Sequence, residues 1–215
     1  MKIYAFADEA SSQLSGQIAA LRSNRLDGIE LRNTDGENVS DLTPAAAREI
    51  RRRMDEAGLA VWSLGSPLGK ADITADFGPQ TEMLSRLLEL ADILGAAHLR
   101  LFSFYTPEAA RDAWRDAVIE RLGTFTEIAA GSGVALCHEN EKGIFGDTAQ
   151  RCMELHRTLP SLRAVFDPAN FVQCGEDAWA AWQQLCPYVE YLHIKDALPD
   201  GCVVPAGCGA GHIPE

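Results

Sequence analysis

The sequence has no apolar run of about 18 or more residues, the length that a membrane-spanning helix needs. Its first apolar stretch, from Ile3 to Ala7, is too short for the core of an export signal and ends in the acidic pair Asp8-Glu9. We therefore expect no membrane partner and no export, and we expect a cytoplasmic protein.

Positive charge is scarce in this sequence. Lys and Arg number 19 against 31 Asp and Glu, so the formal net charge is -12. Because binding to a polyanion draws on clustered Lys and Arg, this balance argues against a nucleic-acid partner. The chain has 215 residues, of which 47% are apolar and 23% charged, an ordinary globular composition that can bury a sizeable core.

Common glycine and cysteine motifs are also missing. No G-x-G-x-x-G turn follows the first apolar run, and no G-x-x-x-x-G-K-[ST] loop occurs, so nucleotide binding has no support. The six cysteines include no C-x-x-C pair. Without an export signal we expect them to be reduced thiols, most of them buried and unreactive.

The sequence does contain a regular alternation of short apolar runs and longer amphipathic stretches. The runs predict strands at residues 3–7, 28–33, 59–64, 98–102, 134–137, 162–166 and 189–194. The stretches predict helices at residues 14–24, 43–57, 79–94, 107–130, 148–159 and 177–185. Repeated βαβ units of this kind build a parallel sheet, and strands that are apolar almost throughout are typical of a sheet covered on both faces.

Seven such units are one short of a (β/α)8 TIM barrel, which usually takes about 250 residues. A doubly wound sheet is disfavoured, because the glycine turn is missing after the first strand. We predict one α/β TIM-barrel domain over residues 1–215, C-terminally incomplete, with an eighth strand and helix beyond Glu215; the alternative is that the ordered part ends there. The segment from Asp196 onward is glycine-rich, and Pro214-Glu215 look like the start of a helix.

Three side chains with metal-ligand chemistry lie at the ends of successive predicted strands. Glu139, Asp167 and His193 are separated by 28 and 26 residues, about one βα unit each. All strand carboxyl ends of a parallel barrel meet on one face, so these groups can point at one centre. Two carboxylates and an imidazole suit Mn²⁺, Mg²⁺, Co²⁺ or Zn²⁺, and the lack of thiolates argues against a structural zinc site. Each residue alone also has a plain structural role open to it, such as starting a turn for Asp167 before Pro168.

The motifs around these residues resemble the metal-site motifs of the xylose isomerase-like TIM-barrel superfamily. They are His138-Glu139-Asn140-Glu141, Phe166-Asp167-Pro168-Ala169-Asn170 and His193-Ile194-Lys195-Asp196. More narrowly, the whole chain is similar to the sugar phosphate isomerase/epimerase proteins of that superfamily. The resemblance implies that Glu139, Asp167 and His193 are metal ligands and that Glu139 is also the catalytic acid/base. The family adds a fourth ligand, a Glu on strand eight, for which this sequence offers no candidate.

The resemblance further implies a metal-dependent sugar or sugar phosphate isomerase or epimerase that works through an enediolate, with carboxylate-mediated proton transfer. An inosose-type dehydratase on the same metal site and a non-catalytic sugar-binding barrel are the alternatives. An endonuclease IV-like activity is disfavoured, because five histidines and an excess of acid provide neither a multi-zinc cluster nor a basic face for DNA.

Several further residues at or past strand ends are candidates for contacts with the substrate, a small sugar or polyol. Lys195 follows His193 by two residues, on the same side of an extended strand, where it can stabilise a developing oxyanion as a catalytic residue. The candidates for substrate binding are Asn170, Lys70, Glu30, Arg32 and His212, each with a plain loop or surface role as the alternative. Tryptophans on the predicted helices would pack on the barrel or on a neighbouring chain in a homo-oligomer.

Overall fold

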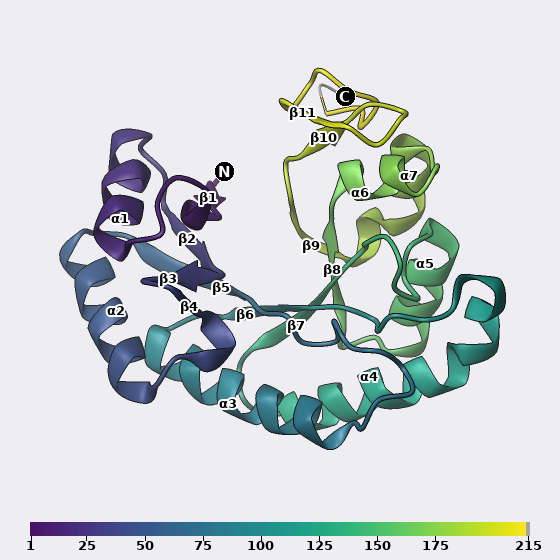
Figure 1. The fold of residues 1–215 in the computed structure, drawn as a ribbon, viewed down its shortest axis with the longest axis horizontal. Coiled ribbons are helices and arrows are strands. Elements are labelled where there is room, and N and C mark those ends of the chain that lie inside the picture. Colours follow the sequence, from purple (N-terminus) through teal and green to yellow (C-terminus); the bar gives the residue numbers. More distant parts are fainter. Residues whose placement is uncertain (214–215) are drawn as a thin grey trace. The chain divides into compact units, whose positions relative to one another are not determined.

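A computed structural model describes residues 1–213 and contains the predicted alternation of strands and helices (Figure 1). The described residues form two compact units, one made of residues 1–67, 78–100 and 128–135 and the other of residues 68–77, 101–127 and 136 onward. Pro214 and Glu215, where the sequence indicates a helix start, lie outside the described residues.

The first unit is built on parallel strands in the order β1-β2-β5-β6. These strands are β1 (Tyr4–Ala5), β2 (Gly28–Leu31), β5 (Ala60–Gly65) and β6 (His98–Leu101). The helices between them are α1 (Leu14–Ser23), α2 (Pro44–Glu56) and α3 (Gly78–Leu94), and both α2 and α3 pack on β5. A small antiparallel hairpin of β3 (Asn33–Thr34) and β4 (Glu37–Asn38) follows β2, and short 3-10 helices span Ala7–Glu9 and Val39–Asp41.

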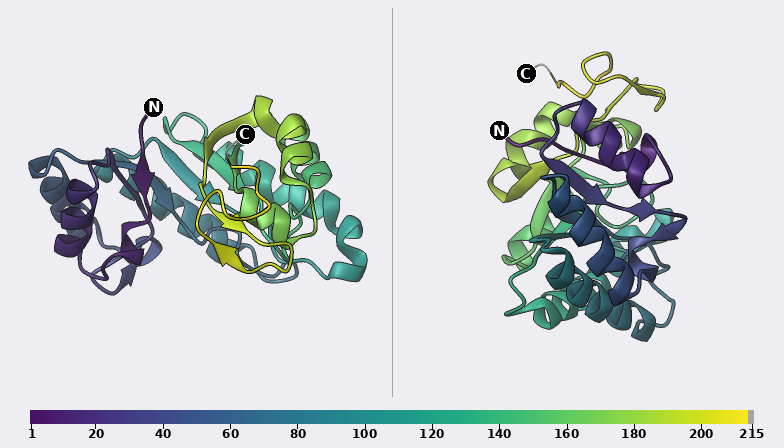
Figure 2. Two further views of the ribbon diagram at one scale, coloured as in Figure 1. Left: turned by 90° about the horizontal axis from the view of Figure 1, so that it is seen from above. Right: turned by 90° about the vertical axis from the view of Figure 1, so that its left-hand side faces the viewer.

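The second unit contains parallel strands in the order β7-β8-β9. They are β7 (Ala135–Glu139), β8 (Arg163–Phe166) and β9 (Val189–Leu192). Its helices are α4 (Arg115–Ala129), α5 (Ala149–Thr158), α6 (Pro168–Gln173) and α7 (Ala178–Leu185), with 3-10 helices at Glu108–Trp114 and Cys186–Tyr188. In Figure 1, α5 and α7 lie on the same side of β8. An antiparallel hairpin of β10 (Asp196–Ala197) and β11 (Val203–Val204) packs against α6 (Figure 2).

Apolar residues from β8 and from helices α5 to α7 form a continuous buried core in the second unit. Phe166, Phe171 and Leu185 are each at most 4% exposed in this core. Burial of one such side chain contributes roughly 1.5–3 kcal/mol, so this core holds α6 and α7 firmly against the end of β8.

Helix starts follow from local sequence signals. Thr43 Oγ1 accepts a hydrogen bond from the backbone N–H of Ala46 at 3.1 Å, and Asp177 Oδ1 accepts one from Ala180 N–H at 2.9 Å. Both are N-cap hydrogen bonds, which satisfy backbone donors that have no partner within the helix.

The structure differs from the sequence-based expectation at several places. The first strand, predicted at residues 3–7, is a strand only at Tyr4–Ala5, with a 3-10 helix from Ala7. The strand predicted at residues 28–33 ends at Leu31. The helix predicted over residues 107–130 begins as a 3-10 helix, since Ala110 has a non-helical φ of -133°, and the α-helix starts only at Arg115. Helix α6 was not predicted, because its six residues are too few to show a helical period. The strand predicted over residues 189–194 ends at Leu192.

The six cysteines are free thiols, as expected, but most are not buried. Only Cys137 and Cys152 are buried, while the side chains of Cys186, Cys202 and Cys208 are exposed. The expectation of mostly buried cysteines was therefore wrong, because the last two lie in the hydrogen-bonded surface segment after β9 rather than in the core.

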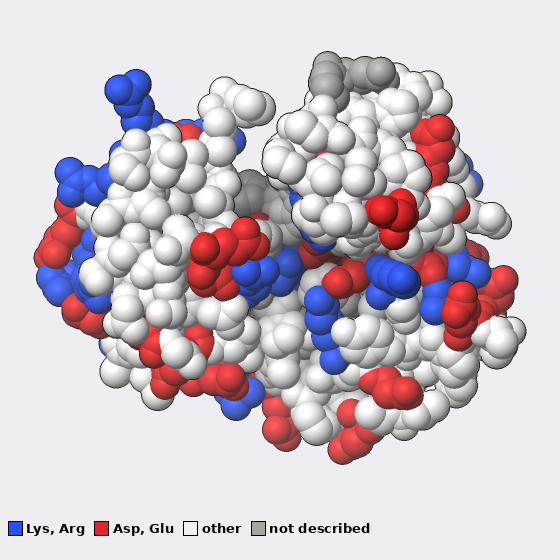
Figure 3. Space-filling view, turned by 45° about the horizontal axis from the view of Figure 1, so that its top comes forward, with Lys and Arg blue, Asp and Glu red and all other residues white. Residues whose placement is uncertain are grey.

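Surface charge and helix length are the two features that relate to nucleic-acid and membrane partners. On the face drawn in Figure 3, acidic and basic side chains are interspersed rather than separated into large patches of one sign. Within residues 1–213, no helix combines the length and the apolar composition that a membrane crossing requires.

Candidate metal centre

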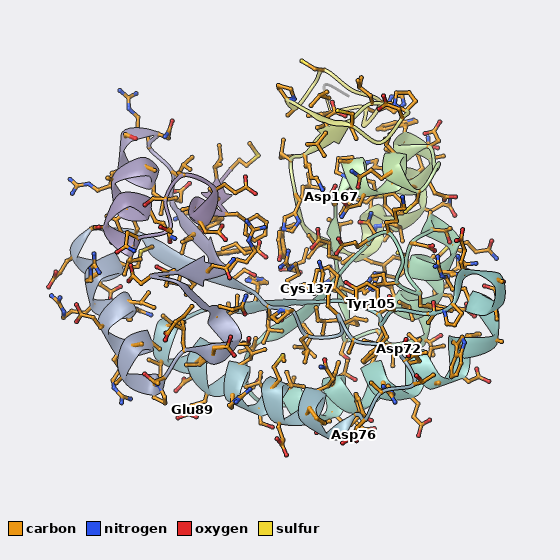
Figure 4. All side chains as sticks on the ribbon, viewed as in Figure 1. Asp72, Asp76, Glu89, Tyr105, Cys137 and Asp167 are labelled. Carbon is orange, nitrogen blue, oxygen red and sulfur yellow. The ribbon has the colours of Figure 1, made fainter. Side chains whose placement is uncertain are left out.

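Glu139, Asp167 and His193 come together in the second unit, and one potential ligand atom from each lies within 4.8 Å of the others. Glu139 is the last residue of β7, Asp167 directly follows β8, and His193 directly follows β9. Figure 4 labels Asp167 at the junction between β8 and α6. The parallel strands therefore bring together the three residues that the sequence singles out, while their role as ligands stays a prediction.

The side chains of Glu139 and His193 are in direct contact. Nδ1 of His193 lies 2.9 Å from Oε1 of Glu139, and both side chains are largely buried, with exposed fractions of 11% and 6%. When the carboxylate is ionised it has no proton to donate, so the imidazole is then the donor of this hydrogen bond. The backbone N–H of His193 also donates to the carbonyl oxygen of Phe166 at 3.0 Å, which continues the β8–β9 pairing beyond the strand and fixes the backbone at His193.

Two asparagines connect the strand ends. Asn140 Oδ1 accepts a hydrogen bond from Asp167 N–H and Asn140 Nδ2 donates to the Asp167 carbonyl oxygen, both at 2.9 Å. Asn170 Nδ2 donates to the Asn140 carbonyl oxygen at 2.9 Å and to Glu139 Oε1 at 3.3 Å. Since both amides are buried and bonded on two sides, they hold the ligand-bearing loops in one arrangement.

Asp167 has both a structural and an electrostatic role at this site. Its Oδ1 accepts a hydrogen bond from Asn170 N–H at 2.9 Å, so it is the N-cap of α6. Burial and, next, the charge of Glu139 raise the pKa of Asp167 to about 6, although Lys195, the Asn170 amide and His193 act in the opposite direction. Two buried carboxylates held this close favour a nearby positive charge.

His138, which directly precedes Glu139, points to the other side of β7. Its Nε2 lies 2.9 Å from Ser103 Oγ, and Ser103 Oγ also accepts a hydrogen bond from Gly146 N–H at 2.8 Å. Burial, with a smaller contribution from His156, lowers the pKa of His138 to about 3. The alternation of side chains along a strand thus separates a neutral core imidazole from the carboxylate of the candidate site.

Lys195 lies beside the three candidate ligands. Its Nζ donates to Asn170 Oδ1 at 2.9 Å and lies 3.9 Å from Asp167 Oδ2. Lys70 Nζ pairs with Glu141 at 2.7 Å and lies 4.2 Å from the centre of the Phe102 ring.

The other predicted substrate-binding residues have different surroundings. Glu30 and Arg32 belong to the first unit, where Glu30 Oε1 lies 3.9 Å from Arg100 Nε and Arg32 Nε donates to Asp8 Oδ2 at 2.8 Å. His212 is exposed and follows the buried Gly211 in the segment after β11. A substrate-binding role for Glu30, Arg32, Lys70 or His212 stays a prediction.

The chemistry of the three candidate ligands fits a divalent cation. Glu139 and Asp167 bring two buried carboxylates to one point, and His193 adds an imidazole. Carboxylate and imidazole together suit Mn²⁺, Mg²⁺, Co²⁺ and Zn²⁺. A cation would also offset the repulsion between the carboxylates that raises the pKa of Asp167.

A model of the xylose isomerase-like TIM-barrel family matches residues 18–214. The chain belongs to this family. The TIM-barrel fold class and the resemblance predicted from the three motifs are thereby confirmed. A comparison with curated protein sequences finds no match.

Solved structures with the xylose isomerase-like fold are similar to this chain over most of its length. A D-tagatose 3-epimerase-like protein aligns with a TM-score of 0.79 and 16% identity, covering 97% of this chain and 82% of the other. The probable 3-DHS dehydratase AsbF of Bacillus anthracis aligns with a TM-score of 0.74 and 20% identity, and the alignment covers 92% of this chain and 74% of the other. A xylose isomerase-like TIM-barrel protein of Mycobacterium smegmatis, solved in complex with magnesium, aligns with a TM-score of 0.74 and 18% identity. This alignment covers 97% of this chain and 82% of the other. At these identities the likeness establishes the fold and not the substrate.

Sequence reasoning missed the contributions of Asn140 and Asp196. Asn140 stands within the quoted motif beside Glu139, but its partner Asp167 is 27 residues away and becomes visible only in the folded chain. Asp196 is fully buried and accepts hydrogen bonds from the backbone N–H groups of Gly207, Gly209 and Gly211, and the glycine spacing of that segment was the hint to these contacts.

Proposed function

We propose that the protein is a divalent-metal-dependent isomerase or epimerase of a sugar or sugar phosphate. The observation that carries this proposal is the convergence of Glu139, Asp167 and His193, within 4.8 Å of one another, at the strand ends of a fold whose family includes sugar isomerases. The similarity to a D-tagatose 3-epimerase-like protein and to a magnesium-containing relative supports it.

In this proposal Glu139, Asp167 and His193 hold the cation, which is Mn²⁺, Mg²⁺, Co²⁺ or Zn²⁺. When bound, a cation supplies Lewis-acid polarisation of a substrate carbonyl and its neighbouring hydroxyl. The hydrogen bonds from Asn140 and Asn170 keep the ligand loops in register, so that little rearrangement is needed on binding.

Glu139 is the proposed acid/base. Its carboxylate takes a proton from the carbon next to the substrate carbonyl, and the C–H electron pair becomes the double bond of an enediolate. Return of the proton to the neighbouring carbon completes an isomerisation. Delivery of a proton from solvent water to the opposite face, while Glu139 keeps the proton that it took, completes an epimerisation. The His193 hydrogen bond orients the Glu139 carboxylate for this transfer.

Lys195 is the proposed stabiliser of the oxyanion. Asn170 Oδ1 accepts a hydrogen bond from Nζ at 2.9 Å and thereby aims the ammonium group along the ligand-bearing face. A positioned ammonium stabilises negative charge that develops on a substrate oxygen during proton transfer. Asn170, Lys70 and His212, all of the second unit, are the proposed contacts for the hydroxyls of a small sugar or polyol.

Proton transfer at carbon gives a direct test. The manganese-loaded protein is incubated in D2O with a panel of ketoses and inositol derivatives, and incorporation of deuterium at carbon is followed by NMR. The proposal expects exchange with at least one sugar and its loss in Glu139→Gln, because the amide cannot accept the proton. A protein that binds manganese but exchanges no substrate proton would instead be a sugar-binding barrel.

A dehydratase on the same site is the second candidate, favoured by the fold similarity to the probable 3-DHS dehydratase. Removal of the same proton by Glu139, followed by departure of a neighbouring hydroxyl as water, would give a conjugated enone. Growth of ultraviolet absorbance without formation of an epimer distinguishes this reaction from isomerisation.

A further inference from the structure

The carboxylate of Asp196 is fully buried and is surrounded by backbone N–H groups. Oδ1 accepts hydrogen bonds from Ala197 at 2.9 Å and Gly211 at 2.8 Å, and Oδ2 accepts them from Gly207 at 3.0 Å and Gly209 at 2.8 Å. Three of the four donors come from one short segment, residues 205–211. This carboxylate therefore holds that segment to β10.

The charge of Asp196 is balanced by backbone dipoles. Among residues 1–213, no Lys, Arg or His forms an ion pair with it. Burial would raise the pKa of Asp196, but the N–H groups of Gly209, Gly211, Ala197 and Gly207 outweigh burial and lower it. Concave arrangements of backbone N–H groups bind anions, and here the anion is a side chain of the same protein.

Close contact explains why glycine occupies two of the donor positions. A Cβ atom at Gly209 would lie 2.4 Å from both the Ala197 carbonyl oxygen and Asp196 Oδ1. A Cβ atom at Gly211 would lie 2.7 Å from Asp196 Oδ1 and 3.2 Å from Pro168 Cβ. The segment thus lies against Pro168, the residue that directly follows the candidate ligand Asp167.

We propose that Asp196 is a positioning residue of the candidate site, acting through Lys195 and His212. Lys195 lies between two fixed points, the strand pairing of His193 and the buried Asp196 carboxylate. His212 directly follows Gly211, which Asp196 and Pro168 hold in place. This proposal deepens the proposed function, in which Lys195 and His212 face the substrate. The contacts that Asp196 makes with residues 205–211 do not depend on which substrate is bound.

The candidate metal ligands are fixed in a different way. His193 N–H donates to Phe166, and Asp167 is bonded to Asn140 and Asn170. We therefore expect loss of the Asp196 carboxylate to disturb Lys195 and residues 205–211 while the metal affinity is retained.

The test compares the wild-type protein with Asp196→Asn and with the matched control Asp200→Asn. Asp200 is exposed in the same hairpin and accepts one backbone hydrogen bond, from Cys202. Hydrogen exchange measured by mass spectrometry reports the 205–211 segment, and acetylation with acetic anhydride reports Lys195, with the exposed Lys142 as internal reference.

In Asp196→Asn we expect exchange in residues 205–211 to accelerate at least tenfold, roughly, while β7 and β8 stay protected. We expect acetylation of Lys195 relative to Lys142 to rise about threefold or more, because Nζ loses its fixed contact with Asn170. The Mn²⁺ dissociation constant should change by less than about threefold. Asp200→Asn should match the wild type in all three measurements.

Unchanged Lys195 reactivity would overturn the positioning role, even if the 205–211 segment exchanged faster. Faster exchange throughout the chain together with loss of Mn²⁺ binding would also overturn it, because Asp196 would then support the fold as a whole. If Asp196→Asn does not fold, Gly209→Ala is measured instead, because its Cβ atom would push the 205–211 segment away from the Asp196 carboxylate. The same changes in exchange, acetylation and Mn²⁺ binding are expected for this variant. Absence of sugar turnover in the wild type would refute the proposed function and leave these three measurements intact.

Discussion

Nδ1 of His193 lies 2.9 Å from Oε1 of Glu139, although the two residues are 54 positions apart in the sequence. His193 directly follows β9 and Glu139 is the last residue of β7, and these two strands pair with β8. Asp167 directly follows β8. Parallel pairing of consecutive strands is therefore sufficient to bring the three groups to one point. The asparagines between the loops then determine how closely they approach.

Replacement of Lys195 by Met should separate catalysis from metal binding. The substitution keeps an apolar stem and removes a positive charge that lies 3.9 Å from Asp167 Oδ2. We expect the rate of substrate deuterium exchange to fall about 100-fold, as with loss of an oxyanion donor. Mn²⁺ should bind about twofold more tightly, because a like charge has been removed. Calorimetric titration and the NMR exchange assay measure the two effects, and weaker Mn²⁺ binding in Lys195→Met would contradict this assignment.

Two glycines with the same backbone conformation should respond differently to alanine. Gly69 and Gly175 have φ of +80° and +77°, but a Cβ atom at Gly69 would lie 2.0 Å from the Phe102 carbonyl oxygen, whereas none of the described atoms lies within 4 Å of one at Gly175. We expect Gly175→Ala to cost about 1 kcal/mol of unfolding free energy, the strain of the conformation alone. Gly69→Ala should cost about 3 kcal/mol or more, because the backbone must also move. Both free energies are measured by urea unfolding. Equal losses in the two variants would show that the close approach of Gly69 to Phe102 does not affect stability.

His156 should make the folded state less stable at mildly acidic pH. Burial lowers its pKa to about 4, although the hydrogen bond to the Leu162 carbonyl oxygen acts in the opposite direction. In the unfolded chain His156 has the ordinary imidazole pKa of 6.5. The stability that its neutral form contributes to the folded state is therefore fully present above that pH and is lost as the pH falls towards 4.

The loss between pH 7.5 and pH 5 should be about 2 kcal/mol from His156 alone. Urea unfolding of the wild type and of His156→Gln at both pH values isolates this contribution. His138, whose pKa of about 3 also responds to His156, stays neutral in the folded protein at both pH values. The difference between the pH values should be smaller in His156→Gln. The same pH dependence in both proteins would show that the imidazole is not kept neutral by the fold.

The sequence predicted those parts of the structure that depend on local pattern. Apolar runs placed the parallel strands, and the spacing of Glu139, Asp167 and His193 placed them at adjacent strand ends. Helix α6 was missed because its six residues, Pro168–Gln173, are fixed by the N-cap at Asp167 and by packing rather than by a periodic pattern. Three of the four backbone donors to Asp196 are 11 to 15 residues further along the chain, so only the glycine spacing hinted at them.

Manganese binding by the metal-free protein tests the central claim most directly. Titration with Mn²⁺, with bound metal measured by mass spectrometry, should give one ion per chain in the wild type. Glu139→Gln and Asp167→Asn should weaken binding at least about 100-fold, since each removes a ligand charge and Asn keeps the N-cap of α6. Glu141→Gln, next to the site, should stay within about threefold of the wild type, because its charge is partly exposed and screened. A wild type that binds no divalent metal, or variants at 139 and 167 that bind it equally well, would contradict the account.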